Sequence, residues 1–208
     1  MSGGYEISKS LSEGWEALKG NFPIMLVATL IVAAIMALLN VLIPFIGSML
    51  ISGPLTAGLL MLALDAVRKR ELNVMRVFDG FKTKLVPLVL VGILTSIFTT
   101  IGFIFIILPG ILVAGWYLFS YFYVFEKDMD FWPAMEKSRE TGFSNHVQAF
   151  GFVAVLALVN LAGLIALGVG LLVTIPLSAC AVASAYEQLE AGAKAKAGQE
   201  GAWPSPKP

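Results

Sequence analysis

The sequence predicts an all-α protein, a polytopic membrane helical bundle of six transmembrane helices arranged as three hairpins, each preceded by a short interfacial amphipathic helix. Three observations support this prediction. Of the 208 residues, 58% are hydrophobic and only 13% are charged, against roughly a quarter charged in an ordinary soluble domain. The mean hydropathy is +0.84. All charged side chains fall into four clusters, and the uncharged windows between the clusters have the length of helical hairpins.

The spacing of the charged clusters determines how many spans the chain can form. One membrane-spanning helix needs about 20 apolar residues, so each uncharged window holds two spans and a tight turn but not three. A hairpin begins and ends on the same side of the membrane, so all four clusters lie on one side. The clusters occupy 6–19, 65–84, 126–140 and 187–207, and the uncharged windows are 20–64, 85–125 and 141–186.

The boundaries of the spans follow from the breaks in the apolar windows. We expect turns at Pro44–Gly47, within Gly102–Gly110, and at Gly168–Gly170, because proline and glycine interrupt regular structure there. The six expected spans are 23–43, 46–66, 86–107, 109–126, 147–167 and 170–188, within one transmembrane domain over residues 1–190. Residues 191–208 are expected to form a flexible cytoplasmic tail.

The distribution of basic residues predicts the orientation of the bundle. Cytoplasmic loops of membrane proteins carry an excess of lysine and arginine, and every basic residue of this chain lies on one side of the predicted bundle. Both termini are therefore expected to be cytoplasmic. The strongest anchor is the loop 65–84, whose basic residues are Arg68, Lys69, Arg70, Arg76, Lys82 and Lys84.

A short amphipathic stretch precedes each uncharged window. Asp130 is a plausible N-cap for the third stretch, with Pro133 tolerated in the first helical turn. Apolar faces opposite charged ones suit helices that lie in the headgroup layer, although polar connectors would show the same composition. The chain thus reads as an internal repeat of three copies. The apolar faces consist of Ile7, Leu11, Trp15 and Leu18, then Met75, Phe78 and Phe81, then Phe131, Trp132 and Met135.

A proline lies early in the second arm of each hairpin, at Pro54, Pro109 and Pro176. The first and third are too close to the next charged residue to precede a full span, so they are expected inside helices as kinks, whereas Pro109 suits a first turn. Neighbouring small residues such as Gly58 and Gly110 allow close helix packing. The second arms are therefore expected to be the inner helices, either simply kinked and packed or broken around a cavity.

Several segments of the chain also resemble a known group of proteins. They are "GWEALKGN", "ISGPLTAGLLMLALDAVRKRE" followed by "VFDGFK", "LPGILVAGWYLFSYFYVFEKDMDFWPAMEKSRETG" and "IPLSACAVASAYEQL", which together extend over about 8–190. This order of motifs is similar to a broad bacterial group of six-helix inner-membrane proteins of unknown function. The group includes the membrane domain attached to some glycerophosphoryl diester phosphodiesterases. The resemblance implies a bacterial cytoplasmic (inner) membrane location and supplies no catalytic residues.

Few residues of the sequence are candidates for chemistry. The single histidine, His146, and the single cysteine, Cys180, lack the partners of a catalytic set or a metal site, so we expect no catalytic residue, metal or cofactor. Asn40 and Asn160 are candidates for interhelical hydrogen bonds or for the polar lining of a path. The remaining candidates are basic residues that could contact anionic lipid headgroups. They are Arg68, Lys69 and Arg70.

These observations favour a non-catalytic integral membrane protein, a scaffold or accessory factor for an envelope or lipid process. The alternative is a small uncoupled transporter or a permeation path for a lipid or a neutral small molecule. No charged residue lies deep in a predicted span, which counts against ion-coupled transport and intramembrane acid–base catalysis. The expected partners are the lipid bilayer, anionic headgroups and other membrane proteins. A net charge of zero gives no support for a nucleic-acid partner.

Overall fold

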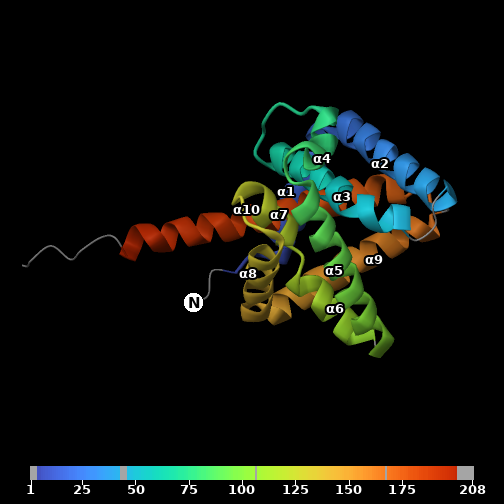
Figure 1. Ribbon diagram of the computed structural model, residues 1–208. Helices are drawn as coiled ribbons and strands as arrows, with labels where there is room; N and C mark the ends of the chain where they lie inside the picture. Colours follow the sequence, from blue (N-terminus) through green and yellow to red (C-terminus); the bar gives the residue numbers. More distant parts are fainter. Residues whose placement is uncertain (1–3, 43–45, 106, 167, 201–208) are drawn as a thin grey trace, which may run out of the picture.

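The computed structural model of the chain describes residues 4–42, 46–105, 107–166 and 168–200, and these residues form helices and turns without a strand. Figure 1 labels the helices. Their bounds are α1 Ile7–Gly20, α2 Phe22–Leu42, α3 Ile46–Val67, η1 Val74–Phe78 (a 3₁₀ helix), α4 Asp79–Thr83, α5 Leu85–Phe105, α6 Ile107–Trp116, α7 Ser120–Glu126, α8 Phe131–Ser144, α9 His146–Ile165 and α10 Leu171–Glu200.

Five of the described helices are long and apolar enough to cross a membrane, and they overlap five of the six expected spans. The prediction of an all-helical protein is therefore confirmed for the described residues, and these five helices have the length and composition of membrane spans. The turns expected at Pro44–Gly47 and in 102–110 include residues outside the described part of the chain. Residue 167, next to the third expected turn at Gly168–Gly170, also lies outside it. The five candidate spans are Phe22–Leu42, Leu50–Val67, Leu85–Ile104, His146–Ile165 and Leu171–Ala195.

The fourth expected span, 109–126, needs correction because it is not one continuous helix. It is divided into α6 and α7, with a turn over 117–119 between them. The hydroxyl of Ser138 on α8 donates to the backbone oxygen of Trp116 at 2.8 Å and accepts from the backbone N–H of Phe119 at 3.1 Å. A side chain from another helix thus takes over the hydrogen bonds that a continuous helix would make. The aromatic residues in this segment also have modest helix propensity.

The C-terminal segment departs from the expected flexible tail. Helix α10 continues through Glu200, so residues 191–200 are helical, while 201–208 lie outside the described residues. Alanine, lysine, glutamine and glutamate dominate the segment, and all four favour helices. In Figure 1 the last part of α10 projects beyond the other helices.

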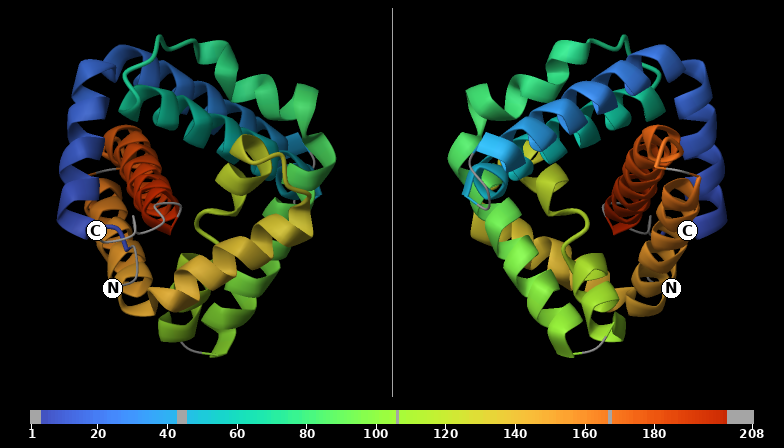
Figure 2. Two further views of the ribbon diagram at one scale, coloured as in Figure 1. Left: turned by 90° about the vertical axis from the view of Figure 1, so that its left-hand side faces the viewer. Right: turned by 90° about the vertical axis from the view of Figure 1, so that its right-hand side faces the viewer.

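Helices that follow one another in the chain pack in pairs, α2 with α3, α5 with α6, and α9 with α10. Figure 1 shows the ends at which the helices of each pair meet, here called the hairpin ends, directed toward one side of the molecule, and Figure 2 shows α10 inside the ring of the other helices, beside α1 and α9. Within an 18-residue window of each candidate span, 67% of the residues are buried in α3 and 50% in α10, but only 17% in α2 and 22% in α5 and α9. The second arms α3 and α10 are therefore the inner helices, and α2, α5 and α9 present their apolar residues outward.

Each expected amphipathic stretch forms a short helix that packs closely on a second arm through a glycine. A Cβ atom on Gly14 of α1 would lie 2.6 Å from the backbone nitrogen of Ala181 in α10. Corresponding contacts join Gly80 of α4 to α3 and Gly142 of α8 to α6. On the expected apolar face of α1, Leu18 is fully buried and Trp15 is 41% exposed. Close approach of two backbones favours small residues, and the residues of α1 that are buried against the bundle are Ser10, Gly14 and Leu18.

Aromatic rings fill the part of the core between α7, α9 and α10. Tyr186 stacks on Phe122 with ring centroids 4.5 Å apart, and Tyr5 contacts Phe119 and Phe152 edge to face at 5.7 and 5.3 Å. All five side chains are at most 2% exposed. Such ring pairs contribute about 0.5–1.5 kcal/mol beyond burial alone, so this cluster fixes the N-terminal residues against the bundle.

Candidate functional site

The charged residues that the sequence placed on one side of the membrane form a network where α3, α7 and α10 end or leave the core. We call this region the charged end. It lies opposite the hairpin ends in Figure 1. The ion-paired residues of the network are Asp65, Arg68, Arg70, Arg76, Asp79, Glu126 and Glu187.

Arg68 joins three second arms. It follows the last residue of α3, its Nη1 lies 2.7 Å from Oε2 of Glu126 at the end of α7, and its Nε lies 2.7 Å from Oε2 of Glu187 in α10. The side chain is only 17% exposed. Burial lowers the pKa of the Arg68 guanidinium, but the hydrogen bonds to Glu126 and Glu187 outweigh this effect and raise its pKa overall. Arg68 is therefore a charged link between the arms.

Asp65, two residues before the end of α3, organises the loop that follows. Its carboxylate accepts from Arg76 Nε at 2.9 Å and lies 3.3 Å from Arg70 Nη1, and Arg76 in turn contacts Asp79 at 3.1 Å. The Asp65 side chain is 11% exposed. Since a buried carboxylate needs charged or hydrogen-bonding partners, these contacts hold η1 and α4 against the end of α3.

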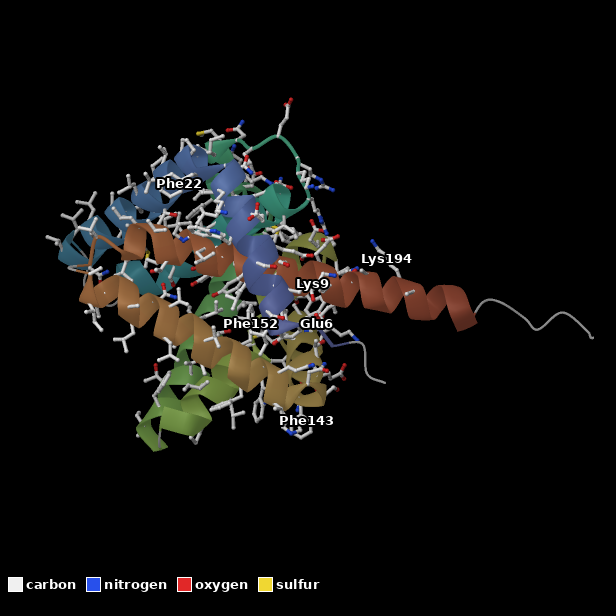
Figure 3. All side chains as sticks on the ribbon, turned by 180° about the vertical axis from the view of Figure 1, so that it is seen from behind. Glu6, Lys9, Phe22, Phe143, Phe152 and Lys194 are labelled. Carbon is white, nitrogen blue, oxygen red and sulfur yellow. The ribbon has the colours of Figure 1, made fainter. Side chains whose placement is uncertain are left out.

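Helix α1 is attached to α10 by a strip of polar side chains. Figure 3 shows α1, between Glu6 and Phe22, lying across α10. Oε2 of Glu13 accepts a hydrogen bond from Ser184 at 2.6 Å, and Gln188 donates to Ser10 at 3.1 Å and accepts from the backbone N–H of Glu6 at 2.9 Å. These bonds orient the acidic side of α1 toward the charged end.

A cavity of about 660 Å³ opens between α1, the end of α3 and α10. This volume lies within the range of small-molecule sites, roughly 300–1,000 Å³. Its wall combines carboxylates, one amide and one ammonium group with small apolar residues. The polar residues of the wall are Ser12, Glu13, Glu16, Asn21, Lys69 and Glu187.

The proline and glycine positions selected from the sequence lie in the second arms α3, α6 and α10. Pro54 and Pro176 are inside α3 and α10, and Pro109 is the third residue of α6. A Cβ atom on Gly58 would lie 2.0 Å from the backbone oxygen of Val77 in η1, and one on Gly110 would lie 2.5 Å from the ring of Phe103. Both glycines therefore occupy close packing contacts, in which a larger side chain has no room.

The two asparagines have different surroundings. Asn40 is exposed near the end of α2, where its amide donates to the backbone oxygen of Met36 at 2.8 Å. Asn160 joins α9 to α10 by donating to Ser178 Oγ at 2.8 Å and also donates to the backbone oxygen of Leu156 at 2.8 Å. Neither arrangement brings the two amides together to line a shared path.

The three candidate lipid-contacting cations are also separated by the structure. Arg68 and Arg70 pair with carboxylates, whereas Lys69 has no ion-pair partner among the described residues. Lys69 has a φ of 54°, in the left-handed region. Arg70 is 56% exposed despite its pairing with Asp65, so Lys69 differs from it in having no carboxylate partner within the described residues.

The remaining candidates supply no catalytic group. His146 begins α9, is exposed, and its Nδ1 lies 3.1 Å from the backbone oxygen of Phe143. Cys180 is fully buried. Within the described residues, no three His, Cys, Asp or Glu side chains are grouped so that they could hold a metal ion.

Comparisons with known proteins place the chain in no family, since no family model, no curated protein and no solved structure matches it. Function must therefore be inferred from the residues themselves. The ion pairs of Arg68 and the bridge made by Ser138 could not be predicted from the sequence, because both depend on contacts between different helices. A usable signal was the acidic residue near the end of each second arm, at Asp65, Glu126 and Glu187.

Proposed function

We propose that this protein is a non-catalytic, multi-pass protein of a bacterial cytoplasmic membrane that acts as a scaffold or accessory factor for an envelope or lipid process. The observation that carries the proposal is the packing between the inner arms. Leu55, Leu62 and Ala63 of α3 and Ala181 and Ala183 of α10 are at most 1% exposed. A packed apolar interior suits a structural role better than it suits a path across the membrane.

The proposed topology keeps three hairpins and places both termini in the cytoplasm. Helices α6 and α7 together make the fourth crossing, with the turn over 117–119 near the cytoplasmic side. Ser138 supports this assignment because it supplies hydrogen bonds to the interrupted backbone, and irregular backbone in a membrane is tolerated where protein groups satisfy it. The exposed aromatic residues Trp15, Trp132 and Phe143 support an interfacial position for α1 and α8.

The proposed topology also includes a threefold internal repeat with a period of about 61 residues. Asp65, Glu126 and Glu187 recur at this interval, from 65 to 126 and from 126 to 187. Equivalent contacts recur with them. Gly58 packs on Val77, and 61 residues later the backbone N–H of Phe119 donates to the hydroxyl of Ser138, since 119 and 138 follow 58 and 77 by that interval. Duplicated units that keep the same contacts would produce this pattern.

The three units form a closed ring in this proposal. The short helix of each unit packs on the second arm of the unit before it, α4 on α3 and α8 on α6, and α1 of the first unit closes the ring on α10 of the last. A glycine followed by an aromatic residue occurs in each short helix, in Gly14–Trp15, Gly80–Phe81 and Gly142–Phe143. Closure of this kind gives a rigid frame, which is the property that a scaffold requires.

The alternative function is an uncoupled permeation path for a lipid or a neutral molecule. The division between α6 and α7 favours it, because interrupted helices often surround transport sites. The buried hydroxyl groups of Tyr5, Ser120 and Tyr186, which have no hydrogen-bond partner among the described residues, would then lie along the path.

Reconstitution separates the two functions. Purified protein in liposomes should give no flux of lipid analogues or small neutral solutes above that of empty liposomes, and mild-detergent purification should retain a specific membrane partner. Protein-dependent flux that is reduced by Gly110→Leu, but not by the outward-facing Ala33→Leu, would replace the scaffold with the permeation path. The absence of both flux and a retained partner would contradict the scaffold.

A further inference from the structure

We propose that the cavity between α1, α3 and α10 binds the zwitterionic headgroup of an aminophospholipid, with its ammonium group on the Glu13 and Glu16 side and its phosphate at Lys69. This inference rests on the membrane placement proposed above. It does not depend on whether the protein acts as a scaffold or as a path.

The position of the cavity identifies a lipid headgroup as its occupant. Gly20 and Asn21 in the wall directly precede Phe22, where the first candidate span begins, and Ala66 and Val67 in the wall end the second. The cavity therefore lies where two adjacent spans leave the hydrocarbon layer. At this depth a bilayer presents its phosphate and amine groups.

Exposed aromatic side chains flank the same position. Trp15 is 41% exposed and Phe22 is 38% exposed, and Lys19 lies 5.3 Å from the centre of the Trp15 ring. Exposed aromatic rings are concentrated at membrane–water interfaces. They place the opening of the cavity at the headgroup layer.

The carboxylate side of the cavity has the chemistry to bind a primary ammonium group. Glu13 is held in place by Ser184 at 2.6 Å, while its Oε1 has only Lys9, at 3.8 Å, as a charged neighbour. Glu16 lies one helical turn further along α1 and contacts the exposed Lys19. The C-terminal ends of α1 and α3 meet at this cavity, and a helix C-terminus favours positive charge. A primary ammonium can donate to these oxygens, whereas a trimethylated one cannot.

The opposite side of the cavity carries the complementary charge. Lys69 is exposed, lines the cavity and makes no ion pair with the described residues, whereas the neighbouring Arg68 is held by Glu126 and Glu187. A lysine ammonium binds phosphate as a point charge. Acidic groups on α1 and an unpaired cation after α3 thus match the two charges of the headgroup.

Gly20 lies in the wall of the cavity and has free space beside it. A Cβ atom at this position would meet no atom within 4 Å, while one on Gly14, in the same helix, would lie 2.6 Å from a backbone atom of α10. Close packing therefore explains Gly14 but not Gly20. A large side chain at 20 can enter the cavity without first displacing protein atoms, which gives a direct way to block it.

The test uses delipidated full-length protein in detergent and measures lipid binding by native mass spectrometry. The probes are dioleoyl phosphatidylethanolamine, the corresponding phosphatidylcholine and phosphatidylglycerol, and soluble glycerophosphoethanolamine. We expect the ethanolamine lipid to bind more tightly than either other lipid, and the soluble headgroup to compete with it. Binding of the ethanolamine lipid should weaken roughly tenfold in Lys69→Gln and in Glu16→Gln, the effect of losing one hydrogen bond to a charged group. Gly20→Phe, which blocks the cavity, should weaken it roughly tenfold as well.

Matched variants outside the cavity serve as controls. Lys82→Gln removes another lysine that has no ion-pair partner within the described part of the chain, Glu140→Gln removes a glutamate that pairs with a lysine three positions away as Glu16 does, and Ala34→Phe adds an aromatic ring to the exposed side of α2. Binding should change less than twofold in each. Equal binding of all three lipids, or equal losses in cavity and control variants, would overturn the headgroup site. Neither result would alter the flux and partner measurements that test the proposed function.

Discussion

The hydroxyl oxygen of Ser138 lies 2.8 Å from the backbone oxygen of Trp116, although the two residues belong to different helices, α8 and α6. The same hydroxyl accepts from the N–H of Phe119 at 3.1 Å and is completely buried. One side chain therefore satisfies both backbone groups at the division between α6 and α7. Both proposed functions, the rigid scaffold and the permeation path, require this contact to stabilise the division between α6 and α7.

We predict that Ser138→Ala destabilises the protein by about 1–3 kcal/mol, because two buried backbone groups lose their partner. The measurement is denaturant or thermal unfolding in detergent. Ser144→Ala, at the exposed end of the same helix, controls for the loss of a hydroxyl from α8. If both variants unfold alike, Ser138 does not support the interrupted backbone.

Enlarging small residues in the inner arms should destabilise the bundle more than enlarging residues that face outward. At Gly58 a Cβ atom would lie 2.0 Å from the backbone oxygen of Val77, and Ala181 is fully buried beside Gly14. Gly58→Leu and Ala181→Leu should each cost about 1–3 kcal/mol or prevent folding, since overpacking forces backbone shifts. Ala33→Leu and Ala157→Leu, at exposed positions, should be tolerated. Equal unfolding temperatures for the two sets would reverse the inner and outer assignment.

Removing the side chain of Arg68 should loosen the charged end. In Arg68→Ala, Glu126 and Glu187 lose the cation that joins them, and we expect a loss of roughly 1–3 kcal/mol in the free energy of unfolding. Arg139→Ala is the matched control, because Arg139 pairs only with Glu136 on its own helix and is 42% exposed. Such exposed pairs contribute about 0–1 kcal/mol. Comparable losses in the two variants would show that Arg68 does not link the arms.

Thiol labelling in intact cells tests the proposed topology. In a Cys180→Ala background, a cysteine at the exposed Val169, near the third hairpin turn, should react with an impermeant reagent from outside. A cysteine at Lys137, on α8, should react only after lysis, because all charged loops are proposed to be cytoplasmic. Labelling of position 137 in intact cells would invalidate the orientation.

The sequence by itself predicted the helical class and the positions of five long apolar helices, because these depend on local composition and on distances along the chain. Charge-free windows and the thickness of a bilayer suffice to predict hairpins, and proline spacing suffices to place Pro54 and Pro176 inside α3 and α10. Asp130 was likewise predictable as an N-cap, since its side chain accepts from the next backbone N–H at 2.8 Å.

Only the tertiary structure decided which contacts hold the arms together. The division of the expected span 109–126 depends on Ser138, and the exposure of Trp15 depends on how closely Gly14 approaches α10. Arg68 is paired whereas Lys69 is not, because Arg68 reaches the carboxylates of Glu126 and Glu187, which lie 58 and 119 positions away in the sequence. Hydrogen bonds and close packing between distant segments leave no periodic signal in a single sequence. To predict such a contact, one must know where the partner residue lies in space as well as which residue it is.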